Sequence, residues 1–229
     1  PAGHGVFVDE PVAGNTTILT IPRRLWVRSL NGDASSLAVA LGHEMQQPSA
    51  PHLAAYVASL PTACPPNLAA RAAADIDVAA ASPLHVHRVQ VLAKDLDALA
   101  GAFPGPDEQE RRTLLACLKM SRGLNDLADD QVEEYPAVMV PFVDLINHHP
   151  ERNVFEMWHR DDSVGLTLFA PRPLAAGTEL RFPYREPASA ARLLLAFGFR
   201  SGPAAALPVE GAALETEHSE AFLRAHGCA

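Results

Sequence analysis

Four polar residues stand in or beside strand-like apolar runs in the second part of the chain: Asp144, Asn147, His148 and Tyr184. A plain hydrophobic core would carry only Val, Ile and Leu in such runs. Polar side chains there cost free energy unless a hydrogen-bond partner or a ligand satisfies each of them. Together with Gly3-His4-Gly5 near the amino end, these residues indicate one pocket for a cofactor and a substrate.

Local capping accounts for some of these residues when they are taken one at a time. Asp and Asn often hydrogen-bond to backbone amides in turns at strand ends. The wider pattern favours a site, because Asp144, Asn147 and His148 directly follow the run 139–142 and Tyr184 ends a later strand. We therefore interpret the four residues as parts of one site, and a set of local caps remains the alternative.

β-branched and aromatic residues predict short strands near both ends of the chain. In the first part, residues 6–8 and 17–21 predict a hairpin or meander across a turn at Gly14-Asn15. The second part contains four further strand-like runs, at residues 138–143, 154–158, 164–169 and 179–182. We expect the strands of the two ends to meet in space around a helical middle.

The region between these strands is Ala-rich and has helical spacing. Four apolar residues recur at the intervals of one helix face: Leu92, Leu96, Leu99 and Phe103. Asp107 and Glu110 predict a capping box for a later helix that continues to Leu124. A last amphipathic helix is predicted over residues 190–197. The pattern as a whole predicts an α+β fold.

The composition is that of an ordinary globular chain and excludes several classes of protein. Of the 229 residues, 48% are apolar and 20% are charged, which argues against wholesale disorder. The formal net charge of −9 disfavours binding to nucleic-acid phosphates and suits a basic protein or peptide partner. No uninterrupted apolar run reaches the length of about 18 residues that a membrane span requires, so none is predicted.

The cysteines and histidines bear on redox state and on metal binding. Cys64, Cys117 and Cys228 lie far apart and form no CxxC pair, which indicates reduced thiols in an intracellular protein. His85 and His87 are two residues apart, and on a helix that spacing directs the rings to different faces. We therefore predict no metal site.

Taken in chain order, the motifs resemble those of the SET-domain methyltransferases, in particular the Rubisco large-subunit lysine methyltransferase type. The matching stretches are Gly3-His4-Gly5, residues 21–26, Ser121-Arg122, residues 141–148, residues 176–179, Tyr184 and residues 193–199. Each motif alone is weak, whereas the shared order extends from Ala2 to Arg200. The resemblance implies a SET fold of small β-sheets with a pseudoknot, interrupted by a helical insertion.

The resemblance also implies boundaries along the chain. N-terminal SET strands would occupy residues 1–33, the helical insertion residues 34–137, and the C-terminal SET core residues 138–202. Residues 203–229 would form a tail in which a truncated helical substrate-binding domain begins.

By resemblance, the candidate residues bind the cofactor S-adenosyl-L-methionine or the acceptor lysine. Tyr184 matches the catalytic tyrosine. The residues that match cofactor-binding positions are Gly3, His4, Arg122, Asn147, His148 and Phe199. The residues that match substrate-binding positions, in the wall of the lysine channel, are Ser121, Asp144 and Phe197. The resemblance implies no metal.

The activity implied is the transfer of a methyl group from S-adenosyl-L-methionine to a lysine amine of a protein substrate. We expect a monomer in the chloroplast or cytoplasm, and any targeting segment is not present in this sequence. The charge and the lack of a long apolar run predict no nucleic-acid or membrane partner. Two alternatives remain. Phe197 stands where relatives often carry tyrosine, which favours a histidine N-methyltransferase of the same fold. Arg185 follows Tyr184 where glycine is usual, which favours a non-catalytic SET-like interaction module.

Overall fold

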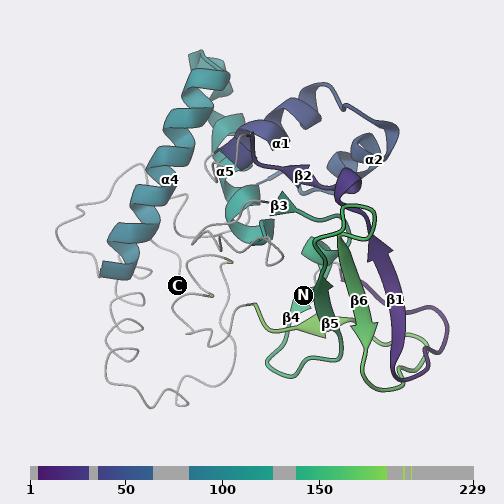
Figure 1. Ribbon diagram of the computed structural model, residues 1–229. Helices are drawn as coiled ribbons and strands as arrows, with labels where there is room; N and C mark the ends of the chain where they lie inside the picture. Colours follow the sequence, from purple (N-terminus) through teal and green to yellow (C-terminus); the bar gives the residue numbers. More distant parts are fainter. Residues whose placement is uncertain are drawn as a thin grey trace. The chain divides into compact units, whose positions relative to one another are not determined.

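The computed structural model describes residues 5–30, 36–63, 83–125 and 138–184, together with Leu193 and Phe197. Contacts divide the chain into two compact units. We call Pro1–Leu60 with Arg122–Glu186 the strand unit, and Pro61–Ser121 with Pro187–Ala229 the helical unit. Helices and small sheets occur together, which confirms the α+β prediction (Figure 1). The pseudoknot, the helical insertion and the domain boundaries remain predictions.

The strand unit contains three small sheets within the described residues (Figure 1). An antiparallel sheet is formed, in spatial order, by β1 (Thr16–Ile21), β6 (Leu166–Ala170) and β5 (Phe155–Trp158). An antiparallel pair is formed by β2 (Val27–Arg28) and β3 (Val138–Met139). A parallel pair is formed by β4 (Asn147–His148) and β7 (Arg181–Phe182). The four later strands are thus confirmed, although all are shorter than predicted and β3 and β7 have only two residues each.

The predicted hairpin between residues 6–8 and 17–21 is wrong. β1 pairs with β6, while Phe7 bridges to Glu179. The Gly14-Asn15 turn does form, with Asn15 at φ 56°. An isolated two-stranded hairpin buries too little apolar surface to be stable, so each run pairs with a later strand. This pairing confirms the expectation that strands from the two ends of the chain meet.

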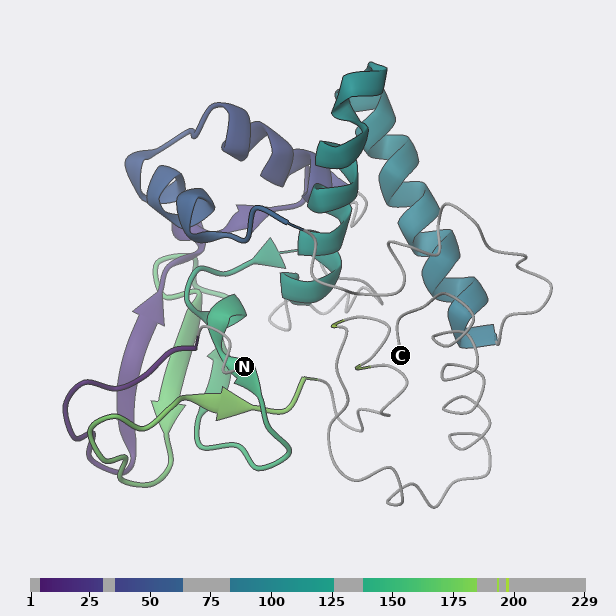
Figure 2. The same ribbon diagram turned by 180° about the vertical axis from the view of Figure 1, so that it is seen from behind.

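The helices begin and end as follows. The strand unit contains α1 (Ser36–Gln46) and α2 (Pro51–Ser59). α4 (Pro83–Ala102) lies in the helical unit, as does α5 (Gln109–Arg122) except for its last residue. Short 3-10 turns are η1 (Arg23–Leu25), η4 (Pro106–Glu108) and η5 (Val143–Leu145). In both views α1 and α2 lie beyond one end of the three-stranded sheet (Figures 1 and 2).

Of the predictions for the helices, the apolar face is confirmed and the capping box is wrong. The apolar face of α4 is confirmed, since Leu92, Leu99 and Phe103 are buried. The capping box is wrong, because Asp107 lies inside η4 and α5 begins only at Gln109. Pro106 is well suited to the first position of a helical turn, and it starts η4 ahead of the predicted cap. The helix predicted over residues 190–197 lies outside the described residues, except at two positions.

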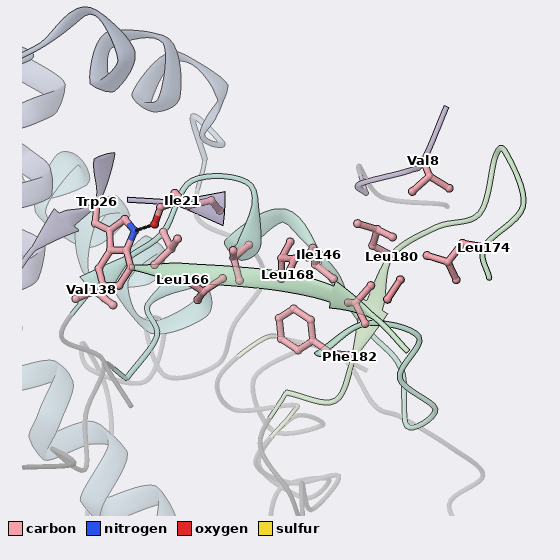
Figure 3. Packing of buried hydrophobic residues seen from close by; sticks show 14 residues of the cluster. Val8, Ile21, Trp26, Val138, Ile146, Leu166, Leu168, Leu174, Leu180 and Phe182 are labelled. Carbon is pink, nitrogen blue, oxygen red and sulfur yellow. Dashed lines mark hydrogen bonds between the residues drawn. The ribbon is translucent and has the colours of Figure 1, made fainter. Parts of the chain in front are cut away.

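The core of the strand unit joins β1 to the elements that carry the candidate site (Figure 3). The indole nitrogen of Trp26 donates to the Ile21 carbonyl at 3.1 Å. The Trp158 ring meets the Trp26 ring edge-on, with centroids 5.7 Å apart. Ile146 and Phe182 belong to the same buried cluster, so the chain on both sides of the parallel pair is anchored in this core.

Cys117, buried in α5, is disulfide-bonded, so the prediction of reduced thiols is wrong for this residue. Distance along the chain did not predict distance in the fold. Cys64 and Cys228 lie outside the described residues.

Within the described ranges, no helix has both the length and the apolar character that crossing a bilayer requires. In the same ranges, no group of three or more His, Cys, Asp or Glu side chains could hold a metal ion.

A buried ion pair joins α4 to α5 in the helical unit. The ammonium nitrogen of Lys119 lies 2.5 Å from Oδ1 of Asp95, and the side chains are 2% and 3% exposed. Removing two charges from water is costly, and their attraction offsets that cost only while both partners are present. The buried charge of each residue is therefore tolerated because the opposite charge lies beside it.

Lys119→Met should lower the free energy of unfolding by about 3–5 kcal/mol, because Asp95 would keep a buried charge without its cation. Adding Asp95→Leu to this variant should recover most of the loss. The partly exposed pair of Arg111 and Glu108 is the control, and Glu108→Gln should cost less than about 1 kcal/mol. Urea denaturation measures all three, and equal losses for the two single variants would contradict the assignment.

Candidate functional site

The parallel pair of β4 and β7 brings the polar motifs together. Asn147 lies opposite Arg181 and His148 opposite Phe182. The pairing continues one step further, since the His149 amide donates to the Phe182 carbonyl at 3.2 Å. Because Tyr184 follows β7 by two residues, the pairing places this tyrosine beside β4.

Tyr184 contacts β4 through both its backbone and its side chain. Its amide donates to Nδ1 of His148 at 2.9 Å, and its hydroxyl donates to the Ile146 carbonyl at 2.5 Å. The Tyr184 ring lies 5.3 Å from the His148 ring and 5.7 Å from the Phe182 ring, centroid to centroid. The phenol is thus held at a fixed place next to the chain that enters β4.

Burial raises the pKa of Tyr184 to about 12, with the nearby Arg122 charge acting against the rise and those of Asp144 and Glu179 adding to it. At neutral pH the hydroxyl therefore remains protonated. Burial, and next the His149 charge, lower the pKa of His148. Since Nδ1 of His148 accepts a hydrogen bond, the neutral ring carries its proton on Nε2.

Asn147 is held by a residue that sequence reasoning missed. Its side-chain nitrogen donates to Oε1 of Glu179 at 2.6 Å. Gly5, the last residue of the predicted glycine motif, lies close to both, because a Cβ on Gly5 would lie 2.5 Å from Oε1 of Glu179 and 2.9 Å from Nδ2 of Asn147. Glu179 was part of a matching motif, but nothing in its spacing singled out the carboxylate.

The amino-terminal segment reaches the site through backbone pairing. The Val8 amide donates to the Thr178 carbonyl at 3.0 Å, and the Leu180 amide donates to the Val6 carbonyl at 2.8 Å. These bonds set Gly5 beside Glu179. Gly3 and His4 lie outside the described residues, so their predicted contact with a cofactor remains a prediction.

Asp144 is buried within a small polar network. Its side chain is fully buried, and Oδ2 accepts a hydrogen bond from the Tyr56 hydroxyl at 2.8 Å. Arg122 donates to the Asp144 carbonyl at 3.0 Å, and the same nitrogen lies 3.7 Å from Oδ2. Burial raises the pKa of Asp144 to about 6, while the Tyr56 hydrogen bond and the Arg122 charge act against the rise.

Two buried atoms of this network have no hydrogen-bond partner among the described residues: Oδ1 of Asp144 and Nε of Arg122. A buried polar atom without a protein hydrogen-bond partner indicates that a water, an ion or a ligand binds there. The contacts of the carboxylate are with Tyr56 and Arg122, and its predicted place in a lysine channel remains a prediction.

The structure therefore gathers five of the predicted site residues in the strand unit: Arg122, Asp144, Asn147, His148 and Tyr184. Ser121 and Phe197 belong to the helical unit. The Ser121 hydroxyl donates to the Cys117 carbonyl at 2.8 Å within α5, and Phe197 is half-buried. Phe199 lies outside the described residues. The roles of these three residues remain predictions.

Comparisons with known proteins identify the fold. The sequence matches no protein-family model and no curated protein at a significant level. Among solved structures, the SET domain of LSMT bound to lysine and AdoHcy has a TM-score of 0.57 at 19% identity, covering 86% of this chain and 50% of that chain. Rubisco LSMT bound to AdoMet has a TM-score of 0.58 at 20% identity, covering 87% and 50%. The chain has a SET-domain fold.

This fold confirms the resemblance that the order of motifs indicated. A third structure, Rubisco LSMT bound to sinefungin and monomethyllysine, agrees with a TM-score of 0.55 at 19% identity, covering 87% of this chain and 50% of that chain. The chain thus spans about half the length of the solved chains that it matches. At this level of identity the likeness establishes the fold, and the activity has to be argued from the site.

Gly5→Ala should lower the free energy of unfolding by about 1–3 kcal/mol, because its methyl group would displace the Glu179 carboxylate from Asn147. Gly101→Ala is the matched control, because a Cβ at Gly101 in α4 meets no atom within 4 Å. That change should be neutral or stabilise the protein by up to about 1 kcal/mol. Urea denaturation of both variants tests this, and a Gly5→Ala protein as stable as the parent would contradict the close approach.

Proposed function

We propose that this chain is an S-adenosyl-L-methionine-dependent methyltransferase that acts on a lysine amine of a protein substrate. The observation that carries the proposal is the parallel pairing of β4 with β7, which sets the protonated phenol of Tyr184 beside Asn147 and His148. It occurs in a SET-domain fold whose solved relatives were determined with AdoMet, AdoHcy, lysine or monomethyllysine.

The described residues fit this cofactor in two respects. Nε of Arg122 is buried and has no hydrogen-bond partner among the described residues, so a donor is available there for a carboxylate. Gly5 approaches Asn147 and Glu179 so closely that a Cβ would meet both side chains, which brings the predicted glycine motif to Asn147. Arg122, Asn147 and His148 would hold the cofactor, with Gly3, His4 and Phe199 assigned by resemblance.

S-adenosyl-L-methionine would supply a methyl group on a cationic sulfonium. Methyl transfer to an amine is an in-line displacement, so alignment of the reacting atoms contributes much of the rate. Tyr184 is suited to alignment because its hydroxyl proton is already donated to the Ile146 carbonyl. A phenol oxygen can accept a hydrogen bond from an amine and weak contacts from a polarised methyl group.

The acceptor lysine has to arrive neutral, although its unperturbed pKa is about 10.4. Exclusion of water and a neighbouring cation both disfavour the ammonium form and so lower that pKa. Tyr184 is not the base, since its pKa of about 12 keeps the phenol protonated at neutral pH. No strong protein base is then required, because the proton passes to water as the amine enters the site.

Calorimetry with S-adenosyl-L-methionine at pH 8 tests the proposal first. Binding is expected, and neither heat nor a thermal shift would leave a non-catalytic interaction module instead. Incubation with methyl-labelled cofactor and a cell extract, followed by mass spectrometry of the labelled protein, then identifies the acceptor. Label on lysine supports the proposal. Label on histidine would replace it with the histidine N-methyltransferase that the Phe197 substitution favours.

Tyr184→Phe should bind S-adenosyl-L-methionine as tightly as the parent and lose turnover by about 100-fold or more, because only the aligning oxygen is removed. Asn147→Ala is the contrasting variant. It should weaken cofactor binding, because the side chain is lost and the Glu179 carboxylate loses its partner. Calorimetry and single-turnover kinetics separate the two effects. A Tyr184→Phe protein with the parental rate would contradict the assigned role.

A further inference from the structure

Tyr56 is a buried residue in contact with the candidate site that neither the motifs nor the resemblance assigned. It lies on α2, far from the site along the chain, and is 6% exposed. Its hydroxyl donates to Oδ2 of Asp144, 88 residues away, at 2.8 Å. In the sequence it looks like an ordinary core residue of a short Ala-rich helix.

We propose that Tyr56 is a positioning residue, which keeps Asp144 ionised and directed toward Arg122 so that the site is assembled at neutral pH. The inference rests on the proposed function for its cofactor-binding readout only. The geometry on which it stands is the contact of three side chains from separate elements. These are Tyr56 from α2, Asp144 from η5 and Arg122 at the end of α5.

The position of Asp144 matters because η5 leads directly into β4. Ile146, two residues later, provides the carbonyl that accepts the Tyr184 hydroxyl, and Asn147 is the next residue. The turn before it is strained, since Phe142 has φ 70°, which is uncommon for a bulky residue. Such a conformation persists only where surrounding contacts determine it, and the bond from Tyr56 to Asp144 is one such contact.

The ionisation of Asp144 depends on few groups. The side chains that act on it are Tyr56 and Arg122, its own charge acts on Tyr184, and Oδ1 has no hydrogen-bond partner among the described residues. A donor to a carboxylate favours its charged form, and burial disfavours it. Removing the Tyr56 hydroxyl leaves burial opposed mainly by Arg122, so the pKa of Asp144 rises from about 6 toward neutral pH.

The pKa of Asp144 sets the pH below which cofactor binding weakens. In the parent protein Asp144 is mostly ionised above pH 7 and becomes protonated below about pH 6. Protonation removes the charge that faces Arg122 and loosens the guanidinium, which weakens cofactor binding. Without the Tyr56 hydroxyl the same loss occurs at a higher pH.

The direct test is a titration of the Asp144 carboxyl carbon by NMR in the 229-residue chain, with Asp144→Asn used to assign the signal. Tyr56→Phe should raise the midpoint by about one pH unit. Leu53→Val is the matched control, because Leu53 is a buried residue of the same helix without a polar contact to Asp144. Its midpoint should equal that of the parent. An unchanged midpoint in Tyr56→Phe, or equal shifts in both variants, would overturn the proposal.

A second arm does not depend on the folding of Tyr56→Phe. In a background in which the other two tyrosines, Tyr135 and Tyr184, are replaced by Phe, incorporation of 3-fluorotyrosine makes the Tyr56 phenol a stronger hydrogen-bond donor. The midpoint of Asp144 should then fall rather than rise. A midpoint that is unchanged or higher would also overturn the proposal.

Cofactor affinity measured between pH 5 and 9 links the network to the site. The acid-side loss of affinity should move upward in Tyr56→Phe by the same amount as the carboxyl midpoint, and it should disappear in Asp144→Asn. A parallel shift in Leu53→Val would contradict the positioning role. If the parent protein binds no S-adenosyl-L-methionine at any pH, the proposed function fails, while the carboxyl titration still decides whether Tyr56 sets the ionisation of Asp144.

Discussion

The parallel pairing of two very short strands, β4 and β7, is the contact on which the candidate site depends. Only two residue pairs form it, which is too little backbone hydrogen bonding to be stable alone. Packing of Ile146 and Phe182 in the core of the strand unit makes up the difference (Figure 3). The position of the Tyr184 phenol is thus a consequence of hydrophobic burial around β4 and β7.

Several polar groups at the site form hydrogen-bonded pairs, each of which joins segments that are distant in the sequence. The Tyr184 hydroxyl donates to the Ile146 carbonyl, and the Asn147 side chain donates to the Glu179 carboxylate. The Asp144 carboxylate accepts a hydrogen bond from the Tyr56 hydroxyl. Buried polar groups with incomplete partners are costly, so every such pair restricts the conformations that the chain can adopt. This explains how small sheets and irregular turns hold side chains in defined places.

Much of this arrangement could be predicted from the sequence, and the failures have physical causes. The Asp-x-x-Asn-His run and Tyr184 were recognised as one site because polar residues beside apolar strands need partners. Tyr56 was missed because a tyrosine in an Ala-rich helix looks like core until its distant partner is seen. The hairpin prediction failed because local turn propensity does not choose between a neighbouring strand and a distant one. Cys117 was misjudged for the same reason, since spacing along the chain does not give distance in the fold.

The most direct measurement of the central claim is the through-hydrogen-bond scalar coupling between the Tyr184 amide nitrogen and Nδ1 of His148, observed by nitrogen NMR at neutral pH. The bond is 2.9 Å long and joins Tyr184, two residues beyond the end of β7, to β4, as the parallel pairing in the observed register allows. A resolved coupling, with the His148 proton on Nε2, is the result that this account predicts. A neutral His148 that carries its proton on Nδ1, with no coupling to Tyr184, would contradict it.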